Sequence, residues 1–165
     1  MAKLEKLFRA VLRAMRPDGL LYLDEYIGPS RTEWSGEILT PHRAVHASLP
    51  PEIRNGEDLP DPVQADDPSE AIRSSEIEPQ MRIGFETMAR RPYGGTLLSV
   101  LIPRLRRDRL TDSLLERLID EERLLLARGG SSYYAIIVAR PRRGLARLRA
   151  RIHYFAVPKL KRSGS

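Results

Sequence analysis

The sequence contains no cysteine in its 165 residues. Disulfide bonds, thiolate zinc sites and cysteine nucleophiles are therefore excluded, since each of them requires a thiol. No apolar run approaches the roughly 20 residues that a membrane-spanning helix needs. The charged start, Met1–Leu7, also lacks the apolar segment of a secretory signal. These absences predict a cytoplasmic protein with no transmembrane segment.

Acidic residues are missing from the C-terminal end of the chain. From Arg140 to Ser165 there are nine Lys and Arg residues and no Asp or Glu. Residues 1–90 hold 11 Lys and Arg against 16 Asp and Glu, whereas residues 91–165 hold 17 against 6. We interpret residues 141–165 as a basic C-terminal extension. It either contacts an anionic partner, such as nucleic acid or a membrane surface, or simply keeps the chain solvated.

Several motifs of catalytic sites are absent as well. The sequence has no P-loop, no G-x-S-x-G and no H-E-x-x-H, which disfavours the nucleotide hydrolysis, serine hydrolysis and zinc proteolysis that these motifs support. His42 and His46 stand four residues apart, but no third ligand accompanies them in the sequence. We therefore expect no metal site.

The patterns that are present indicate one α/β domain. Residues 4–15 place six apolar side chains on one stripe at helical spacing, and Pro17-Asp18-Gly19 then supplies turn chemistry. The short apolar run 20–23 is typical of a strand in a parallel sheet that helices cover on both faces.

The later elements are predicted from capping residues and periodicity. Ser113 and Glu116 form a capping box at the start of one helix, and Gly129 closes that helix in a left-handed cap. From Arg142 onward the apolar spacing suits a helix and a strand equally, so both remain open. We expect helices at 32–49, 67–78, 96–105 and 113–128, strands at 81–89 and 133–139, and a loop at 50–68.

The first candidate site follows the strand predicted at 20–23. Ligands of open parallel sheets gather beyond the carboxyl ends of the strands, and the segment Asp24–Ser30 occupies that place. Glu25 is a candidate catalytic base for a group transfer, with Asp24 beside it as a substrate-binding residue. The competing interpretation, which has equal weight, is that both are solvated acids at the end of a strand.

Aromatic and basic residues supply the other candidates. Tyr26, Trp34 and Tyr93 are candidates for the walls of a substrate pocket, although aromatic residues of a small protein more often lie in its core. Arg31 and Arg73 are candidates for binding a carboxylate or phosphate of the substrate. For Arg73, an ion pair with a glutamate of its own short helix is the simpler interpretation.

Three segments in this order resemble class I S-adenosylmethionine-dependent methyltransferases: Arg16–Ser30, Asp67–Ile77 and Arg91–Leu98. The first is similar to that family's step into its fifth strand, with Asp18 in place of a glycine, and the third is similar to the segment after its sixth strand. The predicted strand at 133–139 is similar to its seventh.

The resemblance covers residues 1–140 and implies a partial Rossmann-like methyltransferase sheet, made of the C-terminal strands of that fold with flanking helices. The N-terminal strands and the glycine-rich loop that hold S-adenosylmethionine in the family are absent from the sequence, so the residues that bind the cofactor are unknown. The strand at 20–23 would then expose the edge that its missing neighbour covers.

This resemblance implies the substrate-side portion of an enzyme that transfers a methyl group to an unidentified small-molecule or anionic acceptor. Such a portion would be inactive without an N-terminal half, supplied in the same chain or by another chain. The alternative is a non-catalytic binding module that docks on nucleic acid or an anionic membrane surface through residues 141–165.

Overall fold

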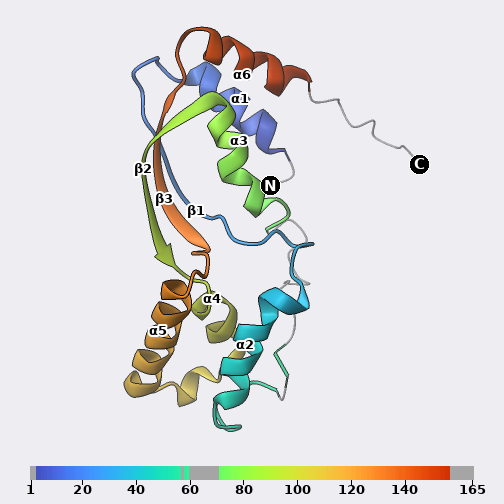
Figure 1. The fold of residues 1–165 in the computed structure, drawn as a ribbon, viewed down its shortest axis with the longest axis vertical. Coiled ribbons are helices and arrows are strands. Elements are labelled where there is room, and N and C mark those ends of the chain that lie inside the picture. The colour runs from blue at the N-terminus through green and yellow to red at the C-terminus, as the bar shows by residue number, and fades with distance from the viewer. Residues whose placement is uncertain (1–2, 57, 60–70, 157–165) are drawn as a thin grey trace, which may run out of the picture.

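The computed structural model of the chain describes residues 3–56, 58–59 and 71–156 and has mixed α/β architecture (Figure 1). Among these residues, a small open sheet of three strands is accompanied by six α-helices and short 3-10 helices. The principal elements are α1 (Leu4–Ala14), β1 (Leu21–Tyr26), α2 (Gly36–Ser48), η1 (Ser74–Glu76), α3 (Ile77–Gly84), β2 (Phe85–Gly94), α4 (Leu98–Leu101), α5 (Asp112–Ala127), β3 (Tyr134–Pro141) and α6 (Gly144–Ala156).

The strand β3 lies in the middle of the sheet, and it pairs antiparallel with both β1 and β2. Because both outer strands oppose β3, they run in the same direction and end at the same end of the sheet. Six consecutive residue pairs join β1 to β3, from Leu21 with Ala139 to Tyr26 with Tyr134. The pairing of β2 with β3 is interrupted by two register shifts.

The prediction for residues 20–23 is right about a strand and wrong about its surroundings. Leu20 precedes β1 and is 66% exposed, and the described neighbour of β1 is antiparallel rather than parallel. Burial alternates from Leu21 to Asp24 because successive side chains point to opposite faces, only one of which is covered by helices. Tyr22, on the uncovered face, is 60% exposed.

One face of the sheet is packed under α1, α3 and α6 (Figure 1). The stripe predicted on residues 4–15 provides Leu4, Phe8 and Leu12, all almost fully buried. They meet Phe85 at the start of β2 and Ile137 of β3, both without exposed surface. Burial of such side chains stabilises a fold by about 1.5–3 kcal/mol each, so this first core is the main source of stability for the sheet.

A second core lies beyond the end of the sheet, among α2, α4 and α5 (Figure 1). Its most deeply buried members are Leu97, Leu101 and Leu118, and Tyr133 joins it from the residue before β3. The helix predicted at 32–49 is confirmed as α2, with Pro41 inside it. In place of the helix predicted at 96–105, only a single turn of α-helix and a 3-10 turn are found.

Three predicted boundaries are wrong. The segment 81–89 was expected to be a strand, but residues 77–84 form α3, because Pro79 sits in the first turn, where its missing N–H is tolerated. The strand β2 then continues to Gly94, beyond the predicted end at residue 89. The helix α5 begins after Thr111, whose hydroxyl accepts from the Leu114 N–H at 3.3 Å, rather than at Ser113.

Other predictions are confirmed. Gly129 has a φ of +96° after α5, as a left-handed cap requires. The strand predicted at 133–139 is β3, displaced by one or two residues. The described part of the ambiguous tail is helical as α6, and its inner residues Ala150 and Tyr154 belong to the first core. Of the helix predicted at 67–78, residues 67–70 lie outside the described residues, and the rest holds only a 3-10 turn, η1, and the start of α3. None of the described helices is both long and apolar enough to cross a bilayer.

Candidate functional site

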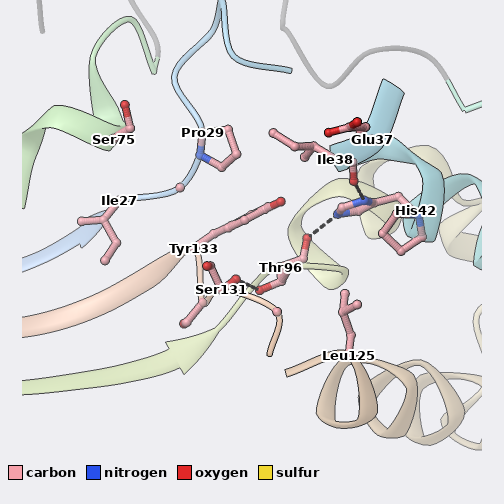
Figure 2. A pocket seen from close by; sticks show the side chains of 14 residues that line it. Ile27, Pro29, Glu37, Ile38, His42, Ser75, Thr96, Leu125, Ser131 and Tyr133 are labelled. Carbon is pink, nitrogen blue, oxygen red and sulfur yellow. Dashed lines mark hydrogen bonds between the residues drawn. The ribbon is translucent and has the colours of Figure 1, made fainter. Parts of the chain in front are cut away.

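A pocket of about 400 Å³ lies at the end of the sheet where β1 and β2 finish (Figure 2). Its lining comes from the loop after β1, the first half of α2, η1, the end of α5, the segment that leads into β3, and Thr96 between β2 and α4. The lining residues are Ile27, Gly28, Pro29, Glu37, Ile38, Pro41, His42, Ser75, Thr96, Leu125, Gly130, Ser131, Ser132 and Tyr133. The pocket lies beyond the carboxyl ends of β1 and β2, next to the segment that enters the antiparallel central strand β3.

The loop after β1 approaches the pocket at Gly28. A Cβ atom at this position would lie 2.7 Å from Cγ of Tyr133 and 2.8 Å from the Tyr26 ring, so only glycine fits. The Ile27 N–H donates to the Tyr133 carbonyl at 2.7 Å, and the Ser74 hydroxyl donates to the Gly28 carbonyl at 3.0 Å. These contacts fix the loop against the segment before β3 on one side and against η1 on the other.

A small polar cluster holds η1 on that loop. The hydroxyls of Ser30 and Ser75 are 2.7 Å apart, and the Glu33 carboxylate accepts from the Ser30 N–H at 2.6 Å and from the Ser75 hydroxyl at 3.0 Å. Ser75 lines the pocket. Its hydroxyl is therefore positioned by two neighbours from the loop after β1.

Arg73 ties the same region to α1. Its guanidinium donates to both Glu5 oxygens, at 2.6 and 3.0 Å, and also to Glu76. The hydrogen bonds from Arg73 lower the pKa of Glu5 and of Glu76 below their ordinary value, and they raise the pKa of Arg73. The ion pair expected from the sequence is present, and Arg73 does not line the pocket. It acts here as an anchor between elements.

A buried glutamate shapes the opposite side of the pocket. Glu122 of α5 is 6% exposed, and its carboxylate accepts from the N–H groups of Gly95, Leu97 and Leu98 at 2.7, 3.0 and 2.8 Å. These three donors belong to the segment after β2, which has no strand or helix partner for them. Glu122 therefore fixes the backbone on either side of Thr96, a pocket residue.

His42 joins α2 to the same segment. Its Nε2 lies 2.9 Å from the Thr96 carbonyl oxygen and its Nδ1 lies 2.8 Å from the Ile38 carbonyl oxygen (Figure 2). The ring also stacks on Tyr133, with centroids 6.3 Å apart. Because both ring nitrogens face carbonyl oxygens of the protein, His42 positions the pocket wall and has no nitrogen left for a substrate.

His46, one turn further along α2, is also buried, at 2% exposure. Burial is the main cause that lowers its pKa below the ordinary value, and the nearby Arg54 lowers it further. Among the described residues, no group of three or more His, Cys, Asp and Glu side chains is placed to hold a metal ion. The four-residue spacing of the two histidines therefore corresponds to packing of one face of α2.

Tyr133 forms the aromatic wall of the pocket. Tyr26 and Trp34 meet its ring edge-on, with centroids 5.9 and 5.8 Å away. Burial raises the pKa of Tyr133 to about 12. Of the three aromatic residues predicted to form the wall, Tyr26 and Trp34 therefore lie behind it as supports, whereas the residue that faces the pocket was not among the predicted site residues.

The remaining predicted site residues lie outside this pocket. Asp24 and Tyr93 meet on the uncovered face of the sheet, where the Tyr93 hydroxyl donates to Asp24 Oδ1 at 2.6 Å. This hydrogen bond raises the pKa of Tyr93 to about 12. Glu25 is exposed on β1, and the backbone N–H of Arg31 donates to Ala71 at 2.7 Å. Their roles in catalysis or substrate binding stay predictions.

The loop predicted to start at Asp24 starts three residues later, at Ile27. The reason is that pairing with β3 continues to Tyr26. Two signals in the sequence indicate parts of the pocket that the candidates above omit. Glu122 lies on the same helix stripe as Leu118 and Leu125. A glutamate in such an apolar stripe is expected to be buried and to have a hydrogen-bond partner. Tyr133 follows a glycine-containing loop directly before a buried strand.

The Thr96 and Ser132 hydroxyls are engaged within the protein, and the Glu37 carboxylate also lines the pocket. The Thr96 hydroxyl donates to the Ser131 carbonyl at 2.5 Å, and the Ser132 hydroxyl accepts from the Gly94 N–H at 2.7 Å. With His42 also engaged, the hydroxyl and imidazole groups at this end serve to hold the pocket in shape. Most of the remaining lining is apolar, as in sites that hold a small molecule in one orientation.

The described residues do not by themselves fit S-adenosylmethionine. Gly94 and Gly95 have positive φ, but the space beside them is filled by the side chains of Glu122 and Tyr134, which a Cβ there would strike. Gly28 is filled in the same way by two tyrosine rings. None of these three glycines therefore leaves open space in which the cofactor could lie.

No family model matches the chain, and neither a curated protein nor a solved structure shows significant similarity to it. The function is therefore inferred from the residues and their geometry.

Proposed function

We propose that this chain is the C-terminal, substrate-side portion of a cytoplasmic class I S-adenosylmethionine-dependent methyltransferase. It binds an unidentified methyl acceptor in the pocket at the ends of β1 and β2, and it requires an N-terminal half for the cofactor. The observation that supports the proposal is the outer edge of β1 directly beside that pocket, which pairs with no other strand among the described residues.

The three segments that resemble the family support the proposal because each of them contributes to the sheet or to the pocket. The turn at residues 16–19, closed by the Gly19 N–H on the Arg16 carbonyl at 3.1 Å, leads from α1 into β1. The segment Arg91–Leu98 includes the end of β2 and supplies Thr96 to the pocket. The part of Asp67–Ile77 that is described includes Ser75, which also lines it.

The cofactor site belongs to the missing half in this proposal. S-adenosylmethionine supplies an activated methyl group, and an enzyme must align the acceptor with it. The residues of this chain contribute the acceptor side: Tyr133 and Ile38 wall the pocket, while Glu122 and His42 hold the backbone around Thr96. A strand of the other half, paired with the outer edge of β1, would bring the cofactor beside this pocket.

The test is methyl transfer by the chain combined with the polypeptide encoded immediately upstream of Met1, in the same frame or in the adjacent gene. We expect no binding of S-adenosylmethionine to this chain alone in calorimetry. The combination is expected to bind it and to transfer the labelled methyl group to a small molecule.

A pocket variant makes the test specific. Ile38→Trp fills the pocket and is expected to lower the transfer rate by at least about tenfold, whereas Leu124→Trp, on an exposed position of α5, leaves it unchanged. Cofactor binding by this chain alone, or no binding and no transfer by the combination, would contradict the proposal.

A further inference from the structure

The helix α6 has an apolar stripe on its outer side. Leu145, Leu148 and Ile152 follow one another at steps of three and four residues, which places them on one face of the helix. Their side chains are 74%, 53% and 60% exposed. Three large apolar side chains in one exposed row are unusual for a helix that contacts only its own chain.

The opposite side of α6 is firmly packed. Ala150 and Tyr154 are buried in the first core, and the Tyr154 hydroxyl donates to the Gln80 carbonyl at 2.6 Å. The Arg147 guanidinium donates to the carbonyls of Leu12 and Met15 at the end of α1, at 3.2 and 3.4 Å. The helix is therefore preformed, and its apolar stripe cannot rotate inward without breaking these contacts.

Positive charge borders the apolar stripe. Arg149 follows Leu145 by four residues and precedes Ile152 by three, so it lies beside the stripe, and it is exposed. Arg143, just before the helix, is exposed as well. The sequence from Arg140 to the end of the chain contains no acidic residue. Glu86 of β2 pairs with Arg140 and lies near Arg143, so Arg149 is the cation that flanks the stripe away from this carboxylate.

We propose that α6 docks this protein on the surface of a bilayer that contains anionic lipids. Leu145, Leu148 and Ile152 enter the boundary between head groups and acyl chains, and Arg149 and Arg143 meet the lipid phosphates. A helix that combines an apolar face with flanking cations has the composition of interfacial helices, which lie in the plane of the membrane surface.

The apolar stripe favours a membrane over nucleic acid. Nucleic acid attracts the arginines through its phosphates, but it offers no apolar phase for three leucine and isoleucine side chains. A bilayer stabilises both features of the helix, because the apolar side chains are buried among acyl chains and the arginines contact lipid phosphates. This function is additional to methyl transfer and does not depend on it.

The test is flotation of the full chain with vesicles of two compositions, pure phosphatidylcholine and an equimolar mixture of phosphatidylcholine and phosphatidylserine. We expect binding to the mixed vesicles to exceed binding to the neutral ones by at least about tenfold. The triple variant Leu145→Ser, Leu148→Ser, Ile152→Ser is expected to lose at least about tenfold on the mixed vesicles.

Two single variants separate the contributions. Arg149→Gln is expected to lose about fivefold on the mixed vesicles and nothing on the neutral ones. Leu124→Ser, an equally exposed leucine on α5, serves as the control and is expected to bind like the unchanged protein. Circular dichroism checks that each variant keeps its helices. A loss of binding is then due to the substituted side chains and not to unfolding.

Three results would overturn the proposal. The first is failure of the unchanged protein to bind the mixed vesicles. The second is equal binding by the triple variant. The third is salt-sensitive binding to a double-stranded DNA oligonucleotide that the triple variant retains while vesicle binding is absent, which would assign the basic helix to nucleic acid.

Discussion

The two edges of the sheet differ in how they are protected against pairing. Along β2 the register shifts twice, between Thr87 and Ala89 and between Pro92 and Gly94, and Arg90 and Arg91 add two adjacent positive charges. Proline, bulges and charge are the usual means of blocking an exposed edge. The strand β1 has neither a proline nor a bulge. Its six consecutive residues pair regularly with β3.

In the proposed function, β2 is the terminal edge and β1 is the edge for a partner. An edge that stays in water throughout the life of a protein is an aggregation hazard unless it is blocked. Among the described residues, β2 carries a proline and two register shifts, whereas β1 is regular and has the pocket at its end. The neighbour of β1 that we propose would account for both the open edge and the incomplete site.

The first prediction tests how deeply each outer strand is anchored within the chain. Phe85, at the start of β2, has no exposed surface and packs against Phe8 with ring centroids 6.2 Å apart. We expect Phe85→Ala to lower the free energy of unfolding by about 4 kcal/mol. Leu21→Ala, on the half-buried start of β1, is expected to cost about 1–2 kcal/mol. Urea unfolding measures the free energy of both variants. Equal decreases would contradict the claim that β2 is anchored more deeply than β1.

The second prediction concerns the backbone that follows β2. Removal of the Glu122 carboxylate leaves three backbone donors without a partner, so Glu122→Ala is expected to lower the free energy of unfolding by about 3 kcal/mol. Glu122→Gln keeps one acceptor and is expected to lose about 1–2 kcal/mol. The control Glu116→Ala, exposed on the same helix, should change stability by less than about 0.5 kcal/mol. If Glu122→Ala also lowered the free energy of unfolding by less than about 0.5 kcal/mol, water would have to satisfy the three N–H groups in place of the carboxylate.

Local patterns predicted those elements whose sequence signal and tertiary packing agree. The stripe on residues 4–15 predicted α1 because the same side chains form the first core. The apolar run before Pro141 predicted β3 because this central strand has neighbours on both edges. The segment 81–89 failed because alternation over a few residues also fits the end of a helix, and Gly84 allows the Tyr154 ring to approach within about 3.0 Å of where a Cβ would lie.

The candidate site was predicted in location and only partly in residues. The position beyond β1 follows from the rule for strand ends, and Ile27 to Pro29 do line the pocket. The contributions of Thr96 and Tyr133 depend on β3 being inserted between β1 and β2, which no pattern within either segment encodes. The three-way hydrogen bonding of Glu122 likewise joins residues more than twenty positions apart.

The third prediction is a pH dependence of the anchor behind the loop after β1. Arg73 lowers the pKa of Glu5 and Glu76, so the unfolded chain binds their protons at a higher pH than the folded chain does. The stability that this pairing contributes is present above the unfolded pKa of about 4.3, and it is lost as the pH falls through the lowered pKa values.

The variant Arg73→Gln isolates this effect. It is expected to lower the free energy of unfolding by about 1–2 kcal/mol at neutral pH and to flatten the acid limb of the stability profile. Arg82→Gln removes a more exposed pair with Glu78 and is expected to change stability by less than about 0.5 kcal/mol. Parallel acid limbs for Arg73→Gln and the unchanged protein would exclude the proposed anchor.

The smallest effect is expected on the uncovered face, where Asp24 of β1 meets Tyr93 of β2. Asp24→Asn is expected to bring the pKa of Tyr93 from about 12 back toward about 10. Both groups are exposed, so the free energy of unfolding should hardly change. Ultraviolet titration of tyrosinate measures the shift, and Tyr93→Phe identifies the transition. An unchanged titration curve in Asp24→Asn would contradict the hydrogen bond between Tyr93 and Asp24.

The most direct measurement of the central claim is backbone hydrogen exchange, recorded with and without the polypeptide encoded immediately upstream of Met1. The account predicts that amides of Leu21–Tyr26 whose N–H groups point away from β3 gain protection on mixing, while the outer edge of β2 stays unchanged. Unchanged exchange in β1, or protection that appears along β2 instead, would contradict the claim that β1 is the edge on which the missing half is built.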